Sequence, residues 1–176
     1  MGYTGGTRKS PTYGALGDHS ESVRIEYDPA RVSYESLLDI FWANHSPEQH
    51  SYSRQYASFI FYSDEEQQKA AAASRDKVAA KLKKKVYTEI VPASIFYPAE
   101  DYHQKYLLRS EASLMKEFRA IYPRDAAFVA STAAARVNGY VSGEGTLAEL
   151  DEELASLGLS EPGRQRLRSI VKSRSH

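Results

Sequence analysis

The sequence predicts an α+β protein with a helical extension at its C-terminal end. Two segments, Glu21–Tyr27 and Val86–Val91, alternate apolar and polar residues, as half-buried strands do. Segments with apolar residues at helical spacing lie between these strands, and beyond residue 124 helical patterns dominate. Strands and helices are therefore expected to mix in the first part of the chain, and helices alone are expected beyond it.

Three strands are expected in the first part of the chain. Glu21–Tyr27 places its apolar residues on one face and ends at an Asp-Pro pair, which favours a turn. Ala57–Tyr62 reads ASFIFY, an aromatic-rich run typical of a buried strand. Val86–Val91 alternates again and stops at a proline.

Two helices are expected to alternate with these strands. The first begins with Ser33 as its N-cap and carries an apolar stripe at helical spacing. The second begins near Asp64, which together with Gln67 fits a capping box. The stripe of the first helix consists of Leu37, Leu38, Phe41 and Trp42.

The second helix ends in a cluster of lysines, Lys81, Lys83, Lys84 and Lys85. Such a cluster can bind anions. It is also what a solvated helix C-terminus carries, because cations there interact favourably with the helix dipole. The sequence favours this second interpretation and leaves the anion patch open.

A boundary is predicted between residues 123 and 124, which divides the chain into a main domain (1–123) and a helical extension (124–176). Within the extension, Thr146–Leu157 has the spacing of an amphipathic helix. Ser160–Val171 has the same spacing, and Pro162 is tolerated in its first turn.

The composition excludes several classes of function. The chain has 23 basic and 23 acidic residues, so no overall charge attracts nucleic acid or an anionic membrane. No apolar run is long enough to cross a bilayer, and the beginning of the sequence has no signal-peptide pattern. The 176 residues contain no cysteine, which excludes disulfides, thiolate metal sites and a thiol nucleophile among them. We expect a soluble, cytoplasmic protein that binds neither nucleic acid nor membrane.

Polar and aromatic groups that suit proton-transfer chemistry gather near the predicted loops. Glu21 begins a strand, Tyr13 lies in the Gly-rich loop before it, and Tyr56 precedes the aromatic strand. A glutamate between aromatic rings can donate a proton, and a tyrosine hydroxyl can donate to an oxygen that gains charge in a transition state. Spacing alone favours the plainer interpretation that these residues form a polar rim.

Other kinds of site find little support. Glu100 and His103 are three positions apart and share a helix face, as ligands in some di-metal bundles do, but no second pair accompanies them. No nucleophile elbow of the G-x-S-x-G kind appears, and the GYTGG segment lacks the spacing of a phosphate-binding loop. We therefore expect neither a metal site nor a bound cofactor.

A series of short motifs, in one order, resembles the peptide methionine sulfoxide reductase A family. The resemblance covers about residues 2 to 109, and the number of motifs in the same order makes it specific. The motifs include GYTGG at Gly2–Gly6, PTY at Pro11–Tyr13, GDHSESV at Gly17–Val23, RQY at Arg54–Tyr56, IFY at Ile60–Tyr62, TEI at Thr88–Ile90 and AEDYHQ at Ala99–Gln104.

The resemblance implies a ferredoxin-like α/β roll with a shallow surface pocket, and reduction of methionine (S)-sulfoxide, free or in proteins. In the family a cysteine thiolate in a Gly-Cys-Phe-Trp motif attacks the sulfur, and thioredoxin or another dithiol restores the thiol. By position in the matching motifs, Glu21 would be the acid that protonates the sulfoxide oxygen. Tyr13 and Tyr56 would be the tyrosines that hold this oxygen.

The sequence departs from the family pattern in three respects. The Gly-Cys-Phe-Trp motif is absent, the last residues carry no resolving cysteine, and the loop from His45 to Gln55 is short, with Ser51 or Ser53 nearest the position of a supporting aspartate. Two hypotheses follow: an N-terminally shortened reductase that is inactive alone, or a cysteine-free binding module that keeps the sulfoxide pocket. The sequence favours the first, because Glu21, Tyr13 and Tyr56 all remain. A shortened chain is also expected to leave strand edges and apolar surface uncovered.

Overall fold

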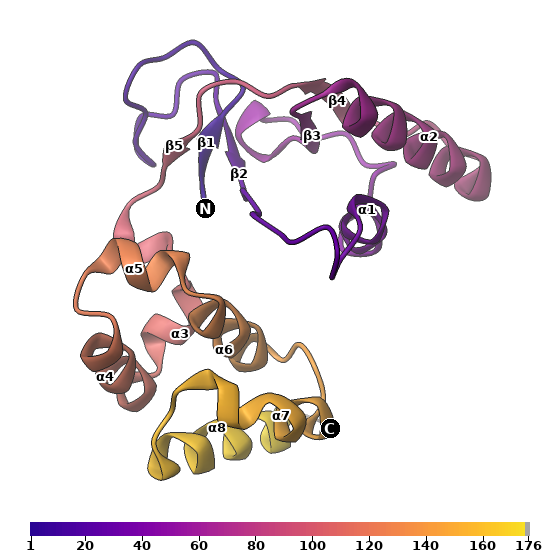
Figure 1. Ribbon diagram of the computed structural model, residues 1–176. Coiled ribbons are helices and arrows are strands. Elements are labelled where there is room, and N and C mark those ends of the chain that lie inside the picture. Colours follow the sequence, from indigo (N-terminus) through magenta and orange to yellow (C-terminus); the bar gives the residue numbers. More distant parts are fainter. Residues whose placement is uncertain (175–176) are drawn as a thin grey trace. The chain divides into compact units, whose positions relative to one another are not determined.

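A computed structural model describes residues 1–174 of the chain (Figure 1). The chain divides into two compact units, Met1–Ala99 and a second unit from Glu100 onward. The first unit holds all five strands of the described residues, and the second is built from helices. The predicted α+β class is therefore confirmed.

A small antiparallel sheet forms one half of the first unit. It contains β1 (Gly2–Thr4), β2 (Ser20–Ser22) and β5 (Tyr97–Pro98), with β1 in the centre. The register pairs Tyr3 with Glu21 on one side and with Tyr97 on the other. All three β1 residues are buried, and the Tyr3 side chain packs in a small apolar cluster.

A parallel pair of strands and two helices form the other half of this unit (Figure 1). The strands β3 (Phe59–Tyr62) and β4 (Glu89–Pro92) pair in parallel and are connected through the helix α2 (Glu65–Leu82). The helix α1 (Tyr34–Ala43) packs against α2. The small core of this half consists of Leu38, Ile60 and Ala71, with Phe41 and Trp42 partly buried against it.

Both predicted helix starts in the first unit are confirmed. The Ser33 hydroxyl accepts a hydrogen bond from the backbone N–H of Ser36, which caps α1. The Asp64 carboxylate accepts from the backbone N–H of Gln67 at 2.8 Å, which caps α2. The Gln67 side chain accepts from the N–H of Ser63 rather than from that of Asp64, so the capping box is shifted by one residue.

The strand predicted over Glu21–Tyr27 is wrong beyond Ser22. The antiparallel register pairs Gly2 with Ser22, so the following residues extend past β1 and have no strand beside them among the described residues. Val23 and Ile25 are 64 % and 57 % exposed. The alternation is present in the sequence, but a strand also needs a neighbouring strand to form its hydrogen bonds.

The other two predicted strands are confirmed with shorter bounds. Ala57–Tyr62 forms β3 from Phe59 onward, and Val86–Val91 forms β4 only from Glu89. The lysine cluster lies where it was predicted, at the C-terminal end of α2, and Lys83 ends the helix in the left-handed conformation.

The second unit consists of short helices around one apolar core. Sixteen buried residues form this core, among them Phe118, Val137 and Leu167. The elements are the 3₁₀ turn η2 (Asp101–His103), α3 (Tyr106–Ser110), α4 (Ala112–Ile121), α5 (Asp125–Ala130), α6 (Thr132–Ser142), α7 (Leu147–Glu153), the 3₁₀ turn η3 (Leu154–Leu157) and α8 (Glu161–Arg174).

The helices predicted near the C-terminal end are present. Thr146 caps α7 in a complete capping box with Glu149, and the predicted helix over Thr146–Leu157 continues as η3. Pro162 lies in the first turn of α8, where its missing N–H is tolerated. The helices α5 and α6, which occupy the small aliphatic stretch after residue 124, were not predicted from the sequence.

The compact units divide at a different place from the predicted boundary at residues 123 and 124. That position lies between α4 and α5, and both helices contribute to the core of the second unit. The boundary at residues 123 and 124 was predicted from a change in the sequence pattern, whereas the two compact units are separated by their packing, so the predicted extension stays a prediction. Among residues 1–174, no helix combines the length and the apolar character needed to cross a membrane.

The core of the second unit makes a first prediction. Leu167 is completely buried in α8, so Leu167→Ala should lower the free energy of unfolding of this unit by about 2–5 kcal/mol. Ile121→Ala is the matched control, because Ile121 is 41 % exposed and should cost less than half as much. Chemical denaturation of the full chain measures both, and equal losses would contradict the packing described above.

Candidate functional site

The three predicted site residues lie in one cluster on the surface of the first unit. Glu21 is the central residue of β2, and Tyr56 ends the 3₁₀ turn η1 (Arg54–Tyr56). The Gln55 side chain joins them, because its amide nitrogen is 2.6 Å from Glu21 Oε1 and 3.1 Å from the hydroxyl of Tyr56. Tyr13 completes the cluster through a side-chain hydrogen bond with Tyr56.

The hydrogen bond with Tyr13 also raises the pKa of Tyr56 above the usual value for a tyrosine. The nearby Glu21 carboxylate contributes to the same shift, because a negative charge disfavours the phenolate. Tyr56 therefore keeps its proton at neutral pH and remains a hydrogen-bond donor. Tyr13 and Tyr56 are 44 % and 62 % exposed, so a ligand from solution can reach both hydroxyls.

A tight turn positions Tyr13. The backbone N–H of Ala15 donates to the carbonyl of Thr12 at 2.9 Å, which closes a turn around Tyr13 and Gly14. Tyr13 is the first of the two residues at the tip, so its ring projects from a loop and is not part of the core.

Serine hydroxyls position Gln55 and Tyr56. The Ser53 side chain caps η1 by accepting from the N–H of Gln55, and the Ser51 hydroxyl donates to the carbonyl of Ser53 at 2.8 Å. Ser51 and Ser53 were expected nearest to the position of a supporting aspartate. In the structure they fix the backbone of the turn that carries the site residues.

Arg54 ties this turn to the first sheet. Its Nε donates to the carbonyl of Asp18 at 2.9 Å and its Nη2 donates to the carbonyl of Gly5 at 3.3 Å. Its own carbonyl accepts from the hydroxyl of the buried Ser20 at 2.6 Å. Because Ser20 precedes Glu21 and Arg54 precedes Gln55, these bonds bring the glutamate and the glutamine together.

A second set of hydrogen bonds fixes the loop that leads into β2. The carboxylate of Asp18 accepts from the backbone N–H groups of Thr7 and Arg8 and from the Thr7 hydroxyl. These bonds, above all the one from the Thr7 backbone, lower the pKa of Asp18 to about 2. Gly17 has a φ of +68°, a conformation that glycine adopts without strain, and this lets Asp18 turn back toward Thr7.

His19 fixes the same loop from inside the unit. Its ring is buried, Nδ1 accepts from the backbone N–H of Gly6 at 3.2 Å, and Nε2 lies 2.8 Å from the carbonyl of Arg8. This pairing requires the tautomer that carries its proton on Nε2. His19 is therefore a structural residue of the loop rather than a group of the site.

Together the cluster presents two hydroxyls, one carboxyl group and one amide on an exposed surface. These groups can meet a ligand oxygen from several directions, as donors do at sites where an oxygen gains charge. The sequence alone predicted no role for Gln55, Arg54 or Asp18. The only indication in the sequence was that Arg54 and Gln55 directly precede Tyr56 in the RQY motif.

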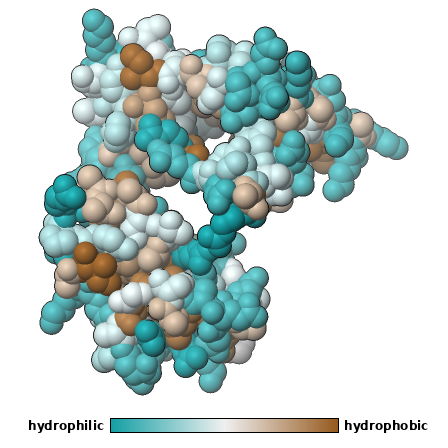
Figure 2. All heavy atoms as spheres, in the orientation of Figure 1, coloured by the Kyte–Doolittle hydropathy of each residue, from teal (hydrophilic) through white to brown (hydrophobic). Residues whose placement is uncertain are grey.

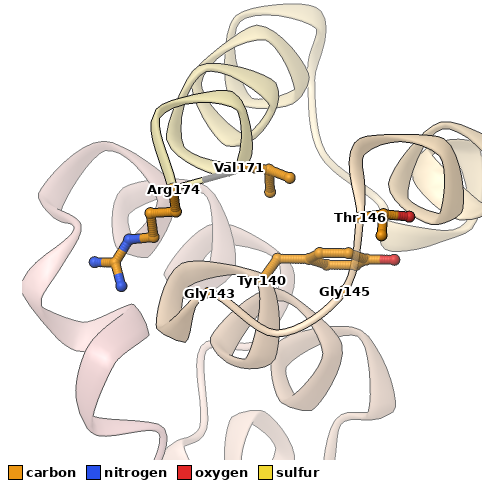
Figure 3. A pocket seen from close by; sticks show the side chains of 6 residues that line it. All are labelled: Tyr140, Gly143, Gly145, Thr146, Val171 and Arg174. Atoms are coloured by element: carbon orange, nitrogen blue, oxygen red, sulfur yellow. The ribbon is translucent and has the colours of Figure 1, made fainter. Parts of the chain in front are cut away.

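Two pockets found among the described residues lie away from this cluster. One, of about 430 Å³, runs along residues 86–91, and the other, of about 210 Å³, is in the second unit. Figure 3 shows the smaller one, with the Tyr140 ring and the Val171 side chain among the residues that line it. Burial raises the pKa of Tyr140, so its hydroxyl stays protonated. Among residues 1–174, no three His, Cys, Asp or Glu side chains gather as metal ligands would.

Comparisons with known proteins show to which family the chain belongs. The family model of the peptide methionine sulfoxide reductases matches residues 1–136. A peptide methionine sulfoxide reductase of Drosophila melanogaster is 39 % identical over 171 residues, which cover 94 % of this chain and 67 % of that protein. A peptide methionine sulfoxide reductase of Methanosarcina acetivorans is 45 % identical over 117 residues, which cover 60 % of this chain and 62 % of that protein.

The fold has a counterpart among solved structures. The crystal structure of Mxr1 from Saccharomyces cerevisiae in reduced form matches with a TM-score of 0.57 and 27 % identity, over 62 % of this chain and 69 % of that one. The chain spans about 58 to 67 % of the length of the first curated relatives that it matches.

The hydrogen bonds of Asp18 make a second prediction. Because its pKa in the folded protein is about 2, below the value of 3.8 for a free aspartate, ionised Asp18 stabilises the loop fully above pH 4. This contribution is lost as the pH falls toward 2. Thr7→Val should raise the pKa of Asp18 part of the way, since the backbone bond remains, and Thr12→Val should leave it unchanged. Titration of the carboxyl carbon by NMR measures these values, and a midpoint near 3.8 in the unaltered chain would contradict the geometry.

Proposed function

Because this chain belongs to the peptide methionine sulfoxide reductase family, we propose that its cluster of Glu21, Tyr13, Tyr56 and Gln55 binds the sulfoxide oxygen of methionine sulfoxide, free or in peptides, and assists its reduction to methionine. The observation that carries the proposal is the convergence of the four side chains. Gln55 lies within hydrogen-bond distance of both Glu21 and Tyr56, and Tyr56 bonds with Tyr13.

The chemistry of a sulfoxide suits such a set of donors. Its oxygen carries partial negative charge, and this charge grows as a nucleophile attacks the sulfur and the sulfur–oxygen bond weakens. Hydroxyl donors aimed at the oxygen therefore stabilise the transition state more than the bound substrate. Glu21 would donate the proton that the departing oxygen needs.

Gln55 would orient Glu21 for this role. The amide nitrogen of Gln55 donates a hydrogen bond to Glu21 Oε1. The other carboxyl oxygen of Glu21 would therefore contact the substrate oxygen. Tyr3, which pairs with Glu21 in the sheet, is a buried aromatic residue on the same face. A carboxyl group beside a buried ring is partly shielded from water, and this favours proton transfer to a bound ligand over exchange with solvent.

The nucleophile has to come from outside these 176 residues, because they contain no cysteine. In the proposed reaction a thiolate attacks the sulfoxide sulfur, the oxygen passes to the thiol sulfur as a sulfenic acid, and methionine is released. A dithiol such as thioredoxin then reduces the sulfenic acid to the thiol, with loss of water and formation of a disulfide. The 176 residues alone would accordingly bind substrate without turning it over.

A binding module without chemistry is the second candidate function. It is favoured by the fact that Glu21, Gln55, Tyr56 and Tyr13 are joined by hydrogen bonds in which no cysteine takes part. Both candidates require the cluster to bind a sulfoxide, and they differ in whether a thiol supplied from outside leads to turnover.

Binding of a sulfoxide is the third prediction. N-acetyl-methionine (S)-sulfoxide should shift the NMR signals of Glu21, Gln55 and Tyr56, and N-acetyl-methionine should not, because it lacks the oxygen. Tyr56→Phe should weaken binding by about 5- to 10-fold, the loss expected for one hydrogen bond of about 1–1.5 kcal/mol. Tyr52→Phe is the matched control, since Tyr52 lies fully exposed in the preceding loop. Equal affinity for sulfoxide and thioether would refute the proposed site.

Turnover is the fourth prediction, and it separates the two candidate functions. The chain alone should not reduce methionine (S)-sulfoxide with dithiothreitol, whereas a chimera that carries the Gly-Cys-Phe-Trp segment of a relative before Met1 should. In the chimera Glu21→Gln should lower kcat by about 10²–10⁴, the usual effect of losing a general acid. Tyr13→Phe should cost less, because Tyr56 and Glu21 still bind the oxygen. An active chimera in which Glu21→Gln has no effect would show that the acid is misassigned, and an inactive but folded chimera would favour the binding module.

A further inference from the structure

Residues 23–27 continue the chain beyond β2 and lie on the surface of the first unit (Figure 1). Val23 and Ile25 are 64 % and 57 % exposed. Among residues 1–174, no backbone–backbone hydrogen bond outside the helices and strands involves this segment. It contains no proline and no residue with a positive φ, so every residue keeps its N–H and the backbone can pair as a strand. The segment therefore lacks only a neighbouring strand.

The side chains of this segment point to two faces. Nη2 of Arg24 lies 3.2 Å from Oε1 of Glu26, so these two charged side chains share one face, as residues two apart in a strand do. The guanidinium carbon of Arg24 also lies 5.0 Å from the centre of the Phe96 ring, which holds the cation on that face. Val23 and Ile25 alternate with the charged residues. One face of the segment thus carries one cation and one anion, and the other face is apolar.

The edge of this segment that faces away from β1 is open. The order of strands in the sheet is β2-β1-β5, so β2 is an edge strand with β1 on one side only. The hydrogen bonds that join η1 to β2 involve the side chains of Ser20 and Glu21, which precede the segment. Backbone groups along an unpaired edge bind readily to another strand. The N–H and C=O groups on this edge are therefore available to a strand of another molecule.

We propose that this edge pairs with the same edge of a second copy of the chain, as two antiparallel strands related by a two-fold axis at Ile25. In this register Arg24 lies opposite Glu26 of the second copy, and Glu26 lies opposite Arg24 of the second copy. The two Ile25 side chains face each other at the axis, and Val23 lies beside Tyr27 of the second copy. Cross-strand pairs of opposite charges and of apolar side chains both stabilise a sheet.

The charges select this register among the symmetric ones. A two-fold axis perpendicular to the sheet places one residue of the strand opposite itself. An axis at Arg24 would bring the two arginines together and an axis at Glu26 would bring the two glutamates together, so like charges disfavour both registers. An axis at Ile25 places no charge opposite its like and forms two attractive pairs. The sequence Val-Arg-Ile-Glu-Tyr is self-complementary in this sense.

A second copy fits this edge better than an unrelated partner. On the face of the molecule shown in Figure 2, hydrophobic residues form only small, separate groups, so recognition there has to rest on backbone pairing and charge rather than on a broad apolar contact. A foreign strand would need one cation and one anion at the matching positions, whereas a second copy supplies them by symmetry. The pairing also closes at two copies, because each copy uses its one open edge of β2.

Sedimentation velocity of the full chain at concentrations from about 10 µM to about 1 mM tests the proposal. We expect a dimer in reversible equilibrium with monomer, with a Kd of about 10–500 µM, because a pair of short strands lies at the small end of protein interfaces. Added salt should weaken the dimer, since two of its pairs are ionic. In NMR spectra, the amide signals that shift with concentration should be confined to residues 22–28, where strand pairing changes the hydrogen bonds.

Charge reversal tests the register itself. Arg24→Glu alone and Glu26→Arg alone each place like charges opposite one another, and each should raise the Kd at least about tenfold. The double variant Arg24→Glu, Glu26→Arg restores opposite charges and should return the Kd to within about threefold of that of the unaltered chain. A mixture of the two single variants should form a heterodimer more tightly than either variant dimerises alone.

The apolar residue at the axis supplies a further test. Ile25→Lys places two ammonium groups opposite each other and should abolish the dimer below about 1 mM. Ile40→Lys is the matched control, because Ile40 is another exposed isoleucine of the first unit and lies outside the segment, so the dimer should persist. Far-UV circular dichroism and the melting temperature show that each variant is folded.

Four results would overturn the proposal. These are a chain that stays monomeric up to about 1 mM, a double variant that dimerises as weakly as the single variants, a dimer that persists in Ile25→Lys, and association into particles larger than a dimer. The measurements use no substrate and no substitution in the sulfoxide site, so their outcome does not depend on the proposed function.

Discussion

The hydrogen bonds of Arg54 are the constraint on which the candidate site depends. The guanidinium group donates to the carbonyls of Asp18 and Gly5, the Arg54 carbonyl accepts from Ser20, and the guanidinium carbon lies 4.8 Å from the centre of the Phe59 ring. One residue thus links the first sheet, the loop before β2 and the strand β3. Since Ser20 and Arg54 each precede a site residue, the same bonds set the distance between Glu21 and Gln55. A site on a shallow surface has little packing around it, so its precision has to come from such polar contacts.

Local sequence patterns predicted the helix starts correctly, but they did not predict where the first strand ends. The helices capped by Ser33, Asp64 and Thr146 begin where the sequence predicted. An N-cap can be predicted locally because its side chain accepts a hydrogen bond from a backbone N–H only two or three residues away. Val23 and Ile25 alternate with polar residues as clearly as any strand, and yet they are exposed coil. A strand needs a partner, and whether one is present depends on residues distant in the sequence. The helices α5 and α6 were missed for the opposite reason, because their alanine-rich sequence has weak periodicity and packing decides their form.

The same distinction applies to the site. Glu21, Tyr13 and Tyr56 were singled out because their motifs resemble those of a known family, and the structure brings their side chains together. The catalytic roles of these residues stay predictions. Gln55, which joins them, and Asp18, which holds the preceding loop, could not be inferred from spacing, because their partners are 34 and 11 residues away. Polar networks of this kind become visible only when the chain is folded, since each bond depends on backbone directions that a sequence pattern does not encode.

The two units are stabilised to different degrees, and the site lies in the less densely packed one. The second unit buries sixteen core residues in one cluster, whereas the first buries three in each of two small clusters. Ile40 and Ile95 of the first unit are also 58 % and 68 % exposed. Burial of apolar surface is the main favourable term in folding, so the first unit has the smaller reserve of stability. Local opening should therefore begin around the site, where hydrogen bonds that water can reach hold the structure, while the helical unit stays folded. Any chain that covered the apolar surface of the first unit would also tighten the loop and the turn that carry Glu21 and Tyr56.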